Sequence, residues 1–428
     1  MAKKKQQSLQ SSPLVAIDLG SDAVRAMAAE CTESGMLHIL GVETSKKFPS
    51  VERGIVNNSS NAGYVISEVM KLLANRIKAD NLPSAFVCVG GQTMQIVNVC
   101  SKRDQVRKRE ITQAMLDEME AECKQKIEKK NIDVAVLDLI PTYFVLDGHE
   151  QDEIPAPPQC ATVVEAHYAA FVGRKELERN VAGSFERSSI FLENSYARPD
   201  ALLSALATAE EMQQGCAVLD MGAQTTTLTI YKEDQYLCNK VIPQGGYDIS
   251  CDIAARGMSI DYAEKLKCQY GIAMPELLTT HHTFKVPSAT QPSGKVVLSE
   301  EELTDIIQSR LDRIFEPVRE ALETYKNHTQ VLYITGGASM LQGMEEYVKA
   351  HTDVPVVLYG SHADNLTIDT PEEWYEPTYS ALVGTLLLGA EYRKTHPTTI
   401  KKKSKFGEFK GSIKESVINF FTEEQTSY

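Results

Sequence analysis

The chain has 428 residues, of which 43% are hydrophobic and 24% are charged. This composition is typical of soluble globular proteins, and the length predicts roughly two to four domains. The formal net charge is −14. It argues against nucleic acid as a general partner, because a phosphate backbone attracts a basic surface.

The cysteines and the N-terminal stretch narrow the class further. The nine cysteines form no CxxC pair, so we expect reduced, buried thiols rather than a zinc site. The opening MAKKKQQSLQSSP is charged and no apolar run follows it, which is unlike a signal peptide. No uncharged apolar run reaches the roughly 18 residues of a membrane-spanning helix. These patterns predict a cytoplasmic protein.

The first motif is LVAIDLGSDAVRAMAAE, residues 14–30. An apolar run reaches Asp18, turns through Gly20 and Ser21 and leaves on a second strand, which predicts a hairpin. Glycine permits a tight turn whose N–H groups point at phosphate oxygens, and a serine hydroxyl adds a donor. An aspartate there can hold a hydrated Mg²⁺. A single turn of this kind is as often purely structural.

The next segment, residues 85–170, combines apolar strands with a charged helix. We expect strands at 85–89 and 134–146 and a helix over 111–130. A helix this rich in charge usually presents a solvated face, and a contact within a polymer is the alternative.

Residues 216–232, CAVLDMGAQTTTLTIYK, repeat the first motif. The candidate residues of this second copy are Asp220, Gly222, Thr225 and Thr226. Two such hairpins facing each other would clamp a polyphosphate, with the two aspartates holding a hydrated Mg²⁺. Because the motif occurs twice, phosphate binding is favoured over a purely structural turn.

Between this motif and the next, the sequence predicts a surface loop and a long helix. Residues 286–295 are rich in Pro, Ser and Gly, which indicates a loop. The helix over 299–326 opens on Ser299-Glu300-Glu301-Glu302, a capping pattern.

The third motif is QVLYITGGASMLQGMEEYV, residues 330–348. It predicts a strand, a turn through Gly336, Gly337 and Ala338, and a helix. A glycine pair lets the backbone lie close against a flat ligand such as adenine or ribose. The alternative is an ordinary turn between a strand and a helix.

The last segment predicts a flexible linker and an amphipathic helix. Residues 395–404 are basic and contain Pro397, which indicates a linker. At about 100° per residue, a helix over 405–425 has one apolar stripe. Its members are Phe406, Phe409, Ile413, Val417 and Phe420, with Phe421 at the edge. Flanking lysines suit an anionic membrane surface. The alternative is docking on the protein's own body or on a partner.

Together the three motifs resemble the phosphate 1, phosphate 2 and adenosine motifs of the actin, Hsp70 and sugar kinase superfamily. From about residue 13 onward the chain resembles the bacterial FtsA family. The resemblance implies an α/β, actin-like ATPase fold with duplicated RNase H-like subdomains and an FtsA-type 1C insertion. The implied boundaries are 13–84 with 171–205 and 380–394 for subdomain 1A, 85–170 for 1C, 215–245 and 330–378 for 2A, 246–329 for 2B, 395–404 for the linker and 405–425 for the amphipathic helix.

The resemblance also implies ATP and Mg²⁺ as ligands. Asp18 and Asp220 would face Mg²⁺, the glycines and hydroxyls of both turns would face phosphates, and the third motif would face the nucleoside. The second phosphate loop reads Asp-Met-Gly-Ala-Gln-Thr, whereas the family usually has Asp-Ile-Gly-Gly-Gly-Thr. We therefore expect weak or no hydrolysis, with ATP acting as a conformational and polymerisation ligand. No catalytic residue is assigned.

The implied partners are those of cell division. Subdomain 2B would dock the C-terminal peptide of FtsZ, with Arg310 and Arg313 gripping acidic groups. The chain would form an actin-like filament with itself and contact later division proteins through subdomain 1C. It would sit peripherally on the cytoplasmic face of the membrane at the septum, attached by the amphipathic helix.

Two other readings share these motifs. A sugar or small-molecule kinase has the same fold but needs a substrate pocket with a catalytic aspartate. A PilM-like pilus-assembly scaffold has the nucleotide motifs and the insertion, and binds a short cytoplasmic peptide of a membrane partner. The amphipathic helix favours the division protein over both.

Overall fold

The computed structural model describes residues 12–396, except 33, 48–49, 280, 292, 359, 362–364 and 368–369. The predicted linker therefore lies almost wholly outside the described residues. The predicted amphipathic helix lies entirely outside them, with its stripe of Phe406, Phe409, Ile413, Val417, Phe420 and Phe421. Within the described part of the chain, no helix is both long enough and apolar enough to span a bilayer.

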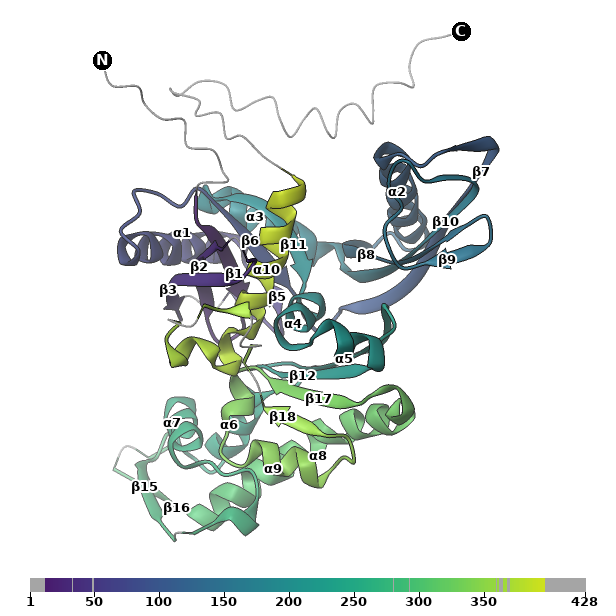
Figure 1. Cartoon of the computed structure of the whole chain (residues 1–428). Coiled ribbons are helices and arrows are strands. Elements are labelled where there is room, and N and C mark those ends of the chain that lie inside the picture. The colour runs from purple at the N-terminus through teal and green to yellow at the C-terminus, as the bar shows by residue number, and fades with distance from the viewer. Residues whose placement is uncertain are drawn as a thin grey trace, which may run out of the picture. The chain divides into compact units, whose positions relative to one another are not determined.

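The first sheet has five strands in the order β11-β6-β1-β2-β3 (Figure 1). They are β1 (Leu14–Leu19), β2 (Val24–Cys31), β3 (Leu37–Ser45), β6 (Ser84–Val89) and β11 (Phe191–Ala197). β1 is antiparallel to β2 and parallel to β6. Every residue of β1 and β6 is buried, so helices must cover both faces of the sheet.

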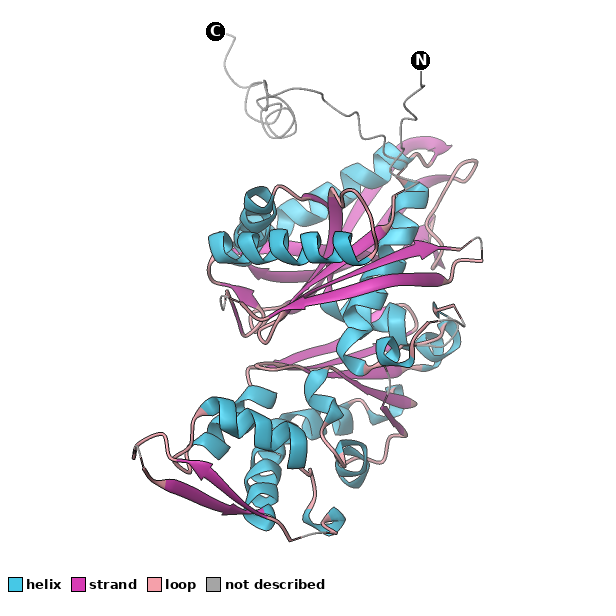
Figure 2. Ribbon diagram, turned by 90° about the vertical axis from the view of Figure 1, so that its left-hand side faces the viewer, coloured by secondary structure: helices cyan, strands magenta, loops and turns pink. Residues whose placement is uncertain are grey.

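Two pairs of helices provide this cover, as Figure 2 shows. One pair is α1 (Ser59–Arg76) and α3 (Lys175–Ser188), and the other is α4 (Arg198–Leu206) and α10 (Ser380–Thr395). In α10, Gly384 lies directly against α4, because a Cβ there would be 1.6 Å from the carbonyl oxygen of Ala201. Glycine at this position allows the two helices to approach closely.

The second sheet repeats the first. Its order is β14-β13-β12-β17-β18, and β12 is antiparallel to β13 and parallel to β17. The strands are β12 (Cys216–Met221), β13 (Thr226–Lys232), β14 (Gln235–Ile242), β17 (Val331–Thr335) and β18 (Val356–Leu358). Short helices α5 (Ala209–Gln214) and α9 (Met344–Ala350) accompany it. The expected α/β fold with a duplicated sheet is confirmed.

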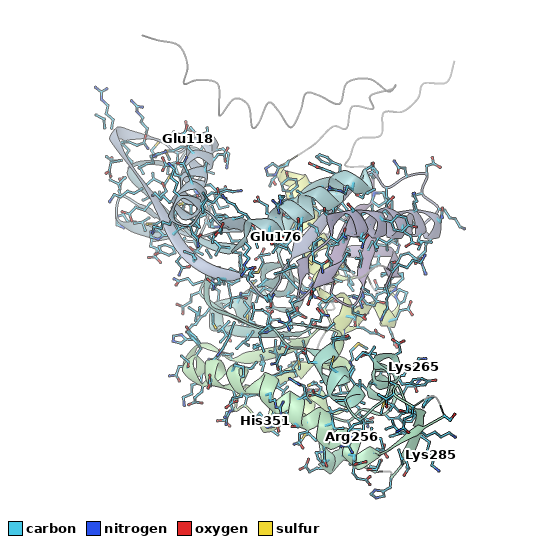
Figure 3. All side chains as sticks on the ribbon, turned by 180° about the vertical axis from the view of Figure 1, so that it is seen from behind. Glu118, Glu176, Arg256, Lys265, Lys285 and His351 are labelled. Atoms are coloured by element: carbon cyan, nitrogen blue, oxygen red, sulfur yellow. The ribbon has the colours of Figure 1, made fainter. Side chains whose placement is uncertain are left out.

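A smaller α/β unit is inserted between β6 and α3. It contains β7 (Gln95–Glu110), α2 (Gln113–Lys130), β8 (Val134–Leu146), β9 (His149–Gln151) and β10 (Cys160–Arg174). The sheet order is β7-β10-β8-β9. Leu116 and Met119 of α2 are buried against this sheet, whereas Glu118 lies on the exposed face (Figure 3). The structure corrects one predicted boundary, because the strand expected at 85–89 within the insertion is β6 of the first sheet.

A second insertion separates β14 from β17. It contains α6 (Gly246–Ala254), α7 (Ile260–Tyr270), the hairpin of β15 (Thr283–Pro287) and β16 (Lys295–Ser299), and α8 (Glu300–Thr324). The expected capping pattern is confirmed, because the Ser299 hydroxyl accepts the Glu302 N–H and the Glu302 carboxylate accepts the Ser299 N–H. The described residues also form five 3₁₀ turns: Pro275–Leu277, Lys326–His328, Gly337–Met340, Glu372–Tyr375 and Pro377–Tyr379.

Candidate functional site

The two Asp-Gly turns have the same local geometry. Gly20 N–H donates to the carbonyl of Ala23 at 3.1 Å, and Gly222 N–H donates to that of Thr225 at 2.9 Å. A Cβ on Gly20 would lie 2.9 Å from the same carbonyl oxygen that its N–H contacts. The equivalent distance at Gly222 is 3.0 Å. Both turns therefore leave little room for a side chain, which explains the repeated glycine.

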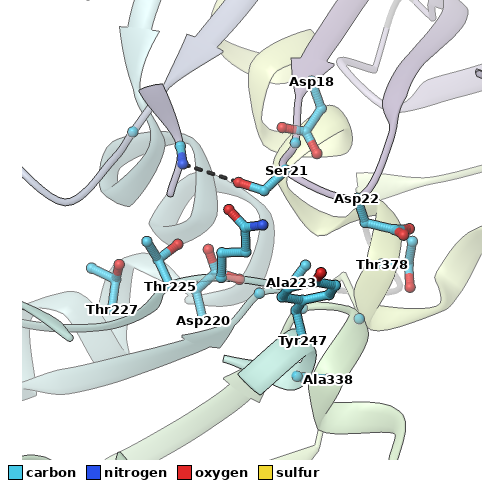
Figure 4. Close-up of a pocket in the computed structure, with 18 of the residues that line it drawn as sticks. Asp18, Ser21, Asp22, Asp220, Ala223, Thr225, Thr227, Tyr247, Ala338 and Thr378 are labelled. Carbon is cyan, nitrogen blue, oxygen red and sulfur yellow. Dashed lines mark hydrogen bonds between the residues drawn. The ribbon is translucent and has the colours of Figure 1, made fainter. Parts of the chain in front are cut away.

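Both turns open into one cleft of about 870 Å³. Figure 4 shows Asp18 and Ser21 of the first turn and Ala223 and Thr225 of the second around it. The cleft brings together most of the residues predicted to bind nucleotide: Asp18, Gly20, Ser21, Asp220, Gly222, Thr225, Gly336, Gly337 and Ala338. Segments that are far apart in the sequence thus meet at a single site.

Thr226 does not face this cleft. It is fully buried, and its hydroxyl donates to the carbonyl of Gln244 at 3.0 Å. Because side chains alternate along β13, its neighbours Thr225 and Thr227 line the cleft instead. The structure therefore does not support the prediction of Thr226 as a phosphate ligand, and Thr227 is the threonine of β13 that lines the cleft beside it.

The third motif approaches the second turn through Gly336. This residue has a φ of 90°, and a Cβ there would lie 2.5 Å from Asp220 Oδ1. Gly337 begins a 3₁₀ turn that ends at Met340, and α9 follows only from Met344. Glycine is needed at 336 both for its backbone conformation and for the contact with Asp220.

The two aspartates form ion pairs with the same arginine, Arg198, for which the sequence predicted no role in the site. Arg198 donates from Nη1 to Asp18 Oδ1 and from Nε to Asp220 Oδ2, both at 2.6 Å. The Asp18 and Asp220 side chains are 4% and 8% exposed, and that of Arg198 is 23% exposed. Burial opposes the charge of Arg198, but the two carboxylates outweigh it and raise the pKa of Arg198.

This arrangement does not fit the predicted magnesium site. Arg198 already contacts one oxygen of each carboxylate, Asp18 Oδ1 and Asp220 Oδ2, so a hydrated Mg²⁺ held by the same pair would share both carboxylates with a cation that is already present. It would also place two cationic groups side by side. In the described ranges, no cluster of three or more His, Cys, Asp or Glu side chains is arranged to hold a metal ion.

The unusual Ala223-Gln224 pair of the second turn has a structural role. Gln224 Oε1 accepts the N–H of Arg53 at 2.8 Å, and Ser21 Oγ accepts the N–H of Gly54 at 3.0 Å. Both donors lie in the hairpin of β4 (Val51–Glu52) and β5 (Ile55–Val56). This hairpin therefore connects the two Asp-Gly turns, and the bond between Gly54 and Ser21 is drawn in Figure 4.

The far end of the cleft is formed where α6 and α7 meet the second turn. Gly246 N–H donates to the Gly222 carbonyl at 3.0 Å. Lys267 Nζ donates to the Gly246 carbonyl at 2.7 Å and to Glu264 at 2.8 Å. Lys267, Glu264 and the partly exposed Tyr247 line the cleft. They give this end both polar groups and a flat aromatic ring.

The two arginines predicted to bind a peptide differ in their exposure and in their partners. Arg310 is 15% exposed and pairs with both carboxylate oxygens of Asp252 at 2.7 Å. It also donates to Gln244 Oε1 at 3.3 Å. Arg310 is thus paired within the protein, whereas Arg313 on the same helix is exposed.

Two of the site residues that the sequence reasoning missed carry some local signal. Arg198 opens α4 just before Pro199, and proline is common at a helix start. The Gly90-Gly91 pair follows β6, and a Cβ on Gly90 would lie 3.2 Å from Cδ of Arg198. A glycine pair after an apolar strand marks a close backbone approach, although the sequence does not show which side chain approaches it.

The sequence of the chain is similar to that of known cell division proteins. Residues 217–384 match the family model of cell division protein FtsA. Over 385 residues the chain is 25% identical to cell division protein FtsA of Pseudomonas aeruginosa, which covers 88% of this chain and 89% of that protein. These matches agree with the family resemblance seen in the sequence.

Solved structures show the same fold at lower identity. The PilM-PilN type IV pilus biogenesis complex has a TM-score of 0.64 at 18% identity, covering 88% of this chain and 98% of that chain. MreB5 of Spiroplasma citri bound to ADP has a TM-score of 0.53 at 11% identity, covering 90% and 98%. The chain therefore has an actin-like fold and is similar to cell division protein FtsA over most of its length.

Proposed function

We propose that this protein is an ATP-binding, actin-like cell division protein that links FtsZ filaments to the cytoplasmic membrane at the septum. The observation that carries the proposal is the meeting of both Asp-Gly turns and the Gly336-Gly337 turn in one cleft. This meeting occurs in a chain that is similar to FtsA over 88% of its residues.

The cleft offers distinct groups to the two ends of a nucleotide. The N–H groups and hydroxyls of the two turns, with Ser21, Thr225 and Thr227, suit phosphate oxygens. Gly337 and Ala338 at the third turn and the ring of Tyr247 suit the nucleoside. The relative MreB5 is described as bound to ADP, which supports an adenine nucleotide here.

Attachment to the membrane would come from the apolar stripe between Phe406 and Phe421. One such segment binds reversibly, because interfacial burial is partial and ordering costs about 1 kcal/mol or more per residue. Self-association into a filament would place many segments on one membrane and multiply their affinity. Polymerisation and attachment would then reinforce each other.

FtsZ would dock on the second insertion through the exposed Arg313 of α8. Arg310 serves the fold there by holding Asp252. The first insertion, with the exposed charged face of α2, would face later division proteins.

The experiment is flotation of the full-length protein with fluorescent FtsZ on vesicles that contain anionic lipid. We expect both proteins to float together. Replacing Phe409 and Phe420 with Glu should abolish flotation of both, while Glu408→Gln, off the apolar stripe, should not. If the protein floats but never carries FtsZ, the tether proposal fails and a PilM-like scaffold becomes the better reading. If the protein does not float, membrane attachment by this segment is wrong.

A further inference from the structure

The strongest unexplained feature is the single guanidinium shared by two carboxylates from different sheets. Asp18 is the penultimate residue of β1 and Asp220 is the penultimate residue of β12, and Arg198 contacts both at 2.6 Å. Its Nη1 also lies 3.9 Å from the sulfur of the buried Cys88. The cation therefore sits at the junction of the two halves, where it neutralises part of their charge.

The surrounding backbone holds Arg198 in this place. The N–H of the preceding Ala197 donates to Asp138 Oδ2 at 2.7 Å, and Pro199 fixes the first turn of α4. On the other side, Gly90 leaves just enough space for the arginine stem. The position of the guanidinium is thus built into the fold and does not depend on a flexible surface side chain.

The chemistry of the guanidinium suits the task of a metal ion. It stays protonated, because the two carboxylates raise the pKa of Arg198. It carries five N–H donors in a planar fork, more than its contacts with Asp18 and Asp220 use. Arg198 also lines the cleft, so the remaining donors are close to the space between the two phosphate turns.

A buried acceptor at the same place remains without a partner. Asp220 Oδ1 has no hydrogen-bond partner among the described residues. A buried carboxylate oxygen of this kind is costly unless a donor or cation compensates it. Here the adjacent guanidinium supplies that positive charge through the second oxygen of the same carboxylate.

We propose that Arg198 takes the place of the divalent cation in this cleft, so that nucleotide phosphates bind to its guanidinium and to the turn N–H groups without Mg²⁺. This inference rests on the proposed nucleotide binding. It predicts that the aspartate pair does not take up a divalent cation and that nucleotide affinity does not depend on one.

The first test measures metal uptake without nucleotide. Binding of Mn²⁺ to the full-length protein is followed by the loss of the free-ion signal in electron paramagnetic resonance. We expect no site in the wild-type protein, and a new site in Arg198→Gln that disappears in Arg198→Gln/Asp18→Asn. Arg198→Lys keeps a cation and should gain no site. Arg256→Gln, which breaks an exposed ion pair with Glu302 away from the cleft (Figure 3), is the matched control.

The second test measures ADP affinity by calorimetry with Mg²⁺ and with a chelator. The affinity of the wild-type protein for ADP should be the same within about twofold in Mg²⁺ and in chelator. Arg198→Gln should bind ADP more weakly than the wild type in chelator, and Mg²⁺ should raise the affinity of this variant at least about tenfold. The inference is overturned if Mg²⁺ raises the ADP affinity of the wild-type protein about tenfold or more, or if the wild-type protein binds Mn²⁺ through Asp18. Both results come from the wild-type protein and do not depend on whether the variant folds. If ADP binds under neither condition, the nucleotide proposal fails, and the Mn²⁺ titration still decides the role of Arg198.

Discussion

Gly336 lies where an added side chain would collide with the carboxylate of Asp220. Its φ of 90° is unfavourable for any side chain, and a Cβ would meet Asp220 Oδ1 at 2.5 Å and the Met221 carbonyl oxygen at 2.6 Å. We expect Gly336→Ala to lower the free energy of unfolding by about 1–3 kcal/mol, measured by urea denaturation.

The neighbouring glycine is the control for this prediction. A Cβ on Gly337 would meet only Thr378 Oγ1, at 3.7 Å, which is an ordinary contact. Gly337→Ala should therefore change the free energy of unfolding by less than about 1 kcal/mol. Equal losses in both variants would show that the contact with Asp220 does not set the requirement for glycine.

At the scale of elements, a buried carboxyl pair joins the first insertion to α4. Asp138 on β8 accepts the Ala197 N–H at 2.7 Å, and Asp200 on α4 accepts the Tyr236 hydroxyl at 2.6 Å. Removal from water and the nearby Asp200 raise the pKa of Asp138 from its ordinary 3.8 to about 7. Burial raises the pKa of Asp200 as well.

The raised pKa of Asp138 predicts that the free energy of unfolding falls as the pH rises toward 7. Because the folded-state pKa of Asp138 is raised, its contribution is fully present below the unfolded value and is lost as pH rises toward 7. Asp138→Asn keeps an acceptor for Ala197 and cannot ionise. We expect the free energy of unfolding of the variant, relative to that of the wild type, to be larger at about pH 8 than at about pH 5. A difference that is equal at both pH values would contradict the raised pKa.

The helix α8 offers a second prediction at this scale. Arg310 is held by two bonds to Asp252, so Arg310→Ala should cost about 1–3 kcal/mol of stability. Arg313 is exposed, so Arg313→Ala should be neutral in thermal unfolding. It should instead weaken binding of the FtsZ C-terminal peptide in fluorescence anisotropy. Unchanged peptide affinity in Arg313→Ala would remove this residue from the docking site.

At the scale of the whole molecule, the repeated pattern made the fold predictable. The two Asp-Gly hairpins share a four-residue turn and pair with equivalent strands, and this similarity is visible in the sequence. The assignment of β6 failed because an apolar strand does not indicate which sheet it joins. Its partner β1 lies about 70 residues earlier, with Ala16 opposite Phe86, and local pattern cannot show such a pairing.

The site was harder to predict than the fold. Thr226 and Thr227 are alike in the sequence, and only the strand register decides which one faces the cleft. Arg198 follows Asp18 by 180 residues and precedes Asp220 by 22. The local sequence around an arginine at the start of a helix does not show whether its side chain is a charge on the surface or an ion-pair partner of two buried carboxylates. The fold alone brings these groups together.

The most direct test of the central claim is hydrogen–deuterium exchange of the full-length protein with and without ATP. The account predicts that ATP protects residues 18–24, 220–227 and 334–341 together, because these three segments line one cleft. The hairpin β15–β16 does not line the cleft and should be unaffected. Protection of only one segment, or of none while the protein is folded, would contradict a nucleotide site built from both sheets.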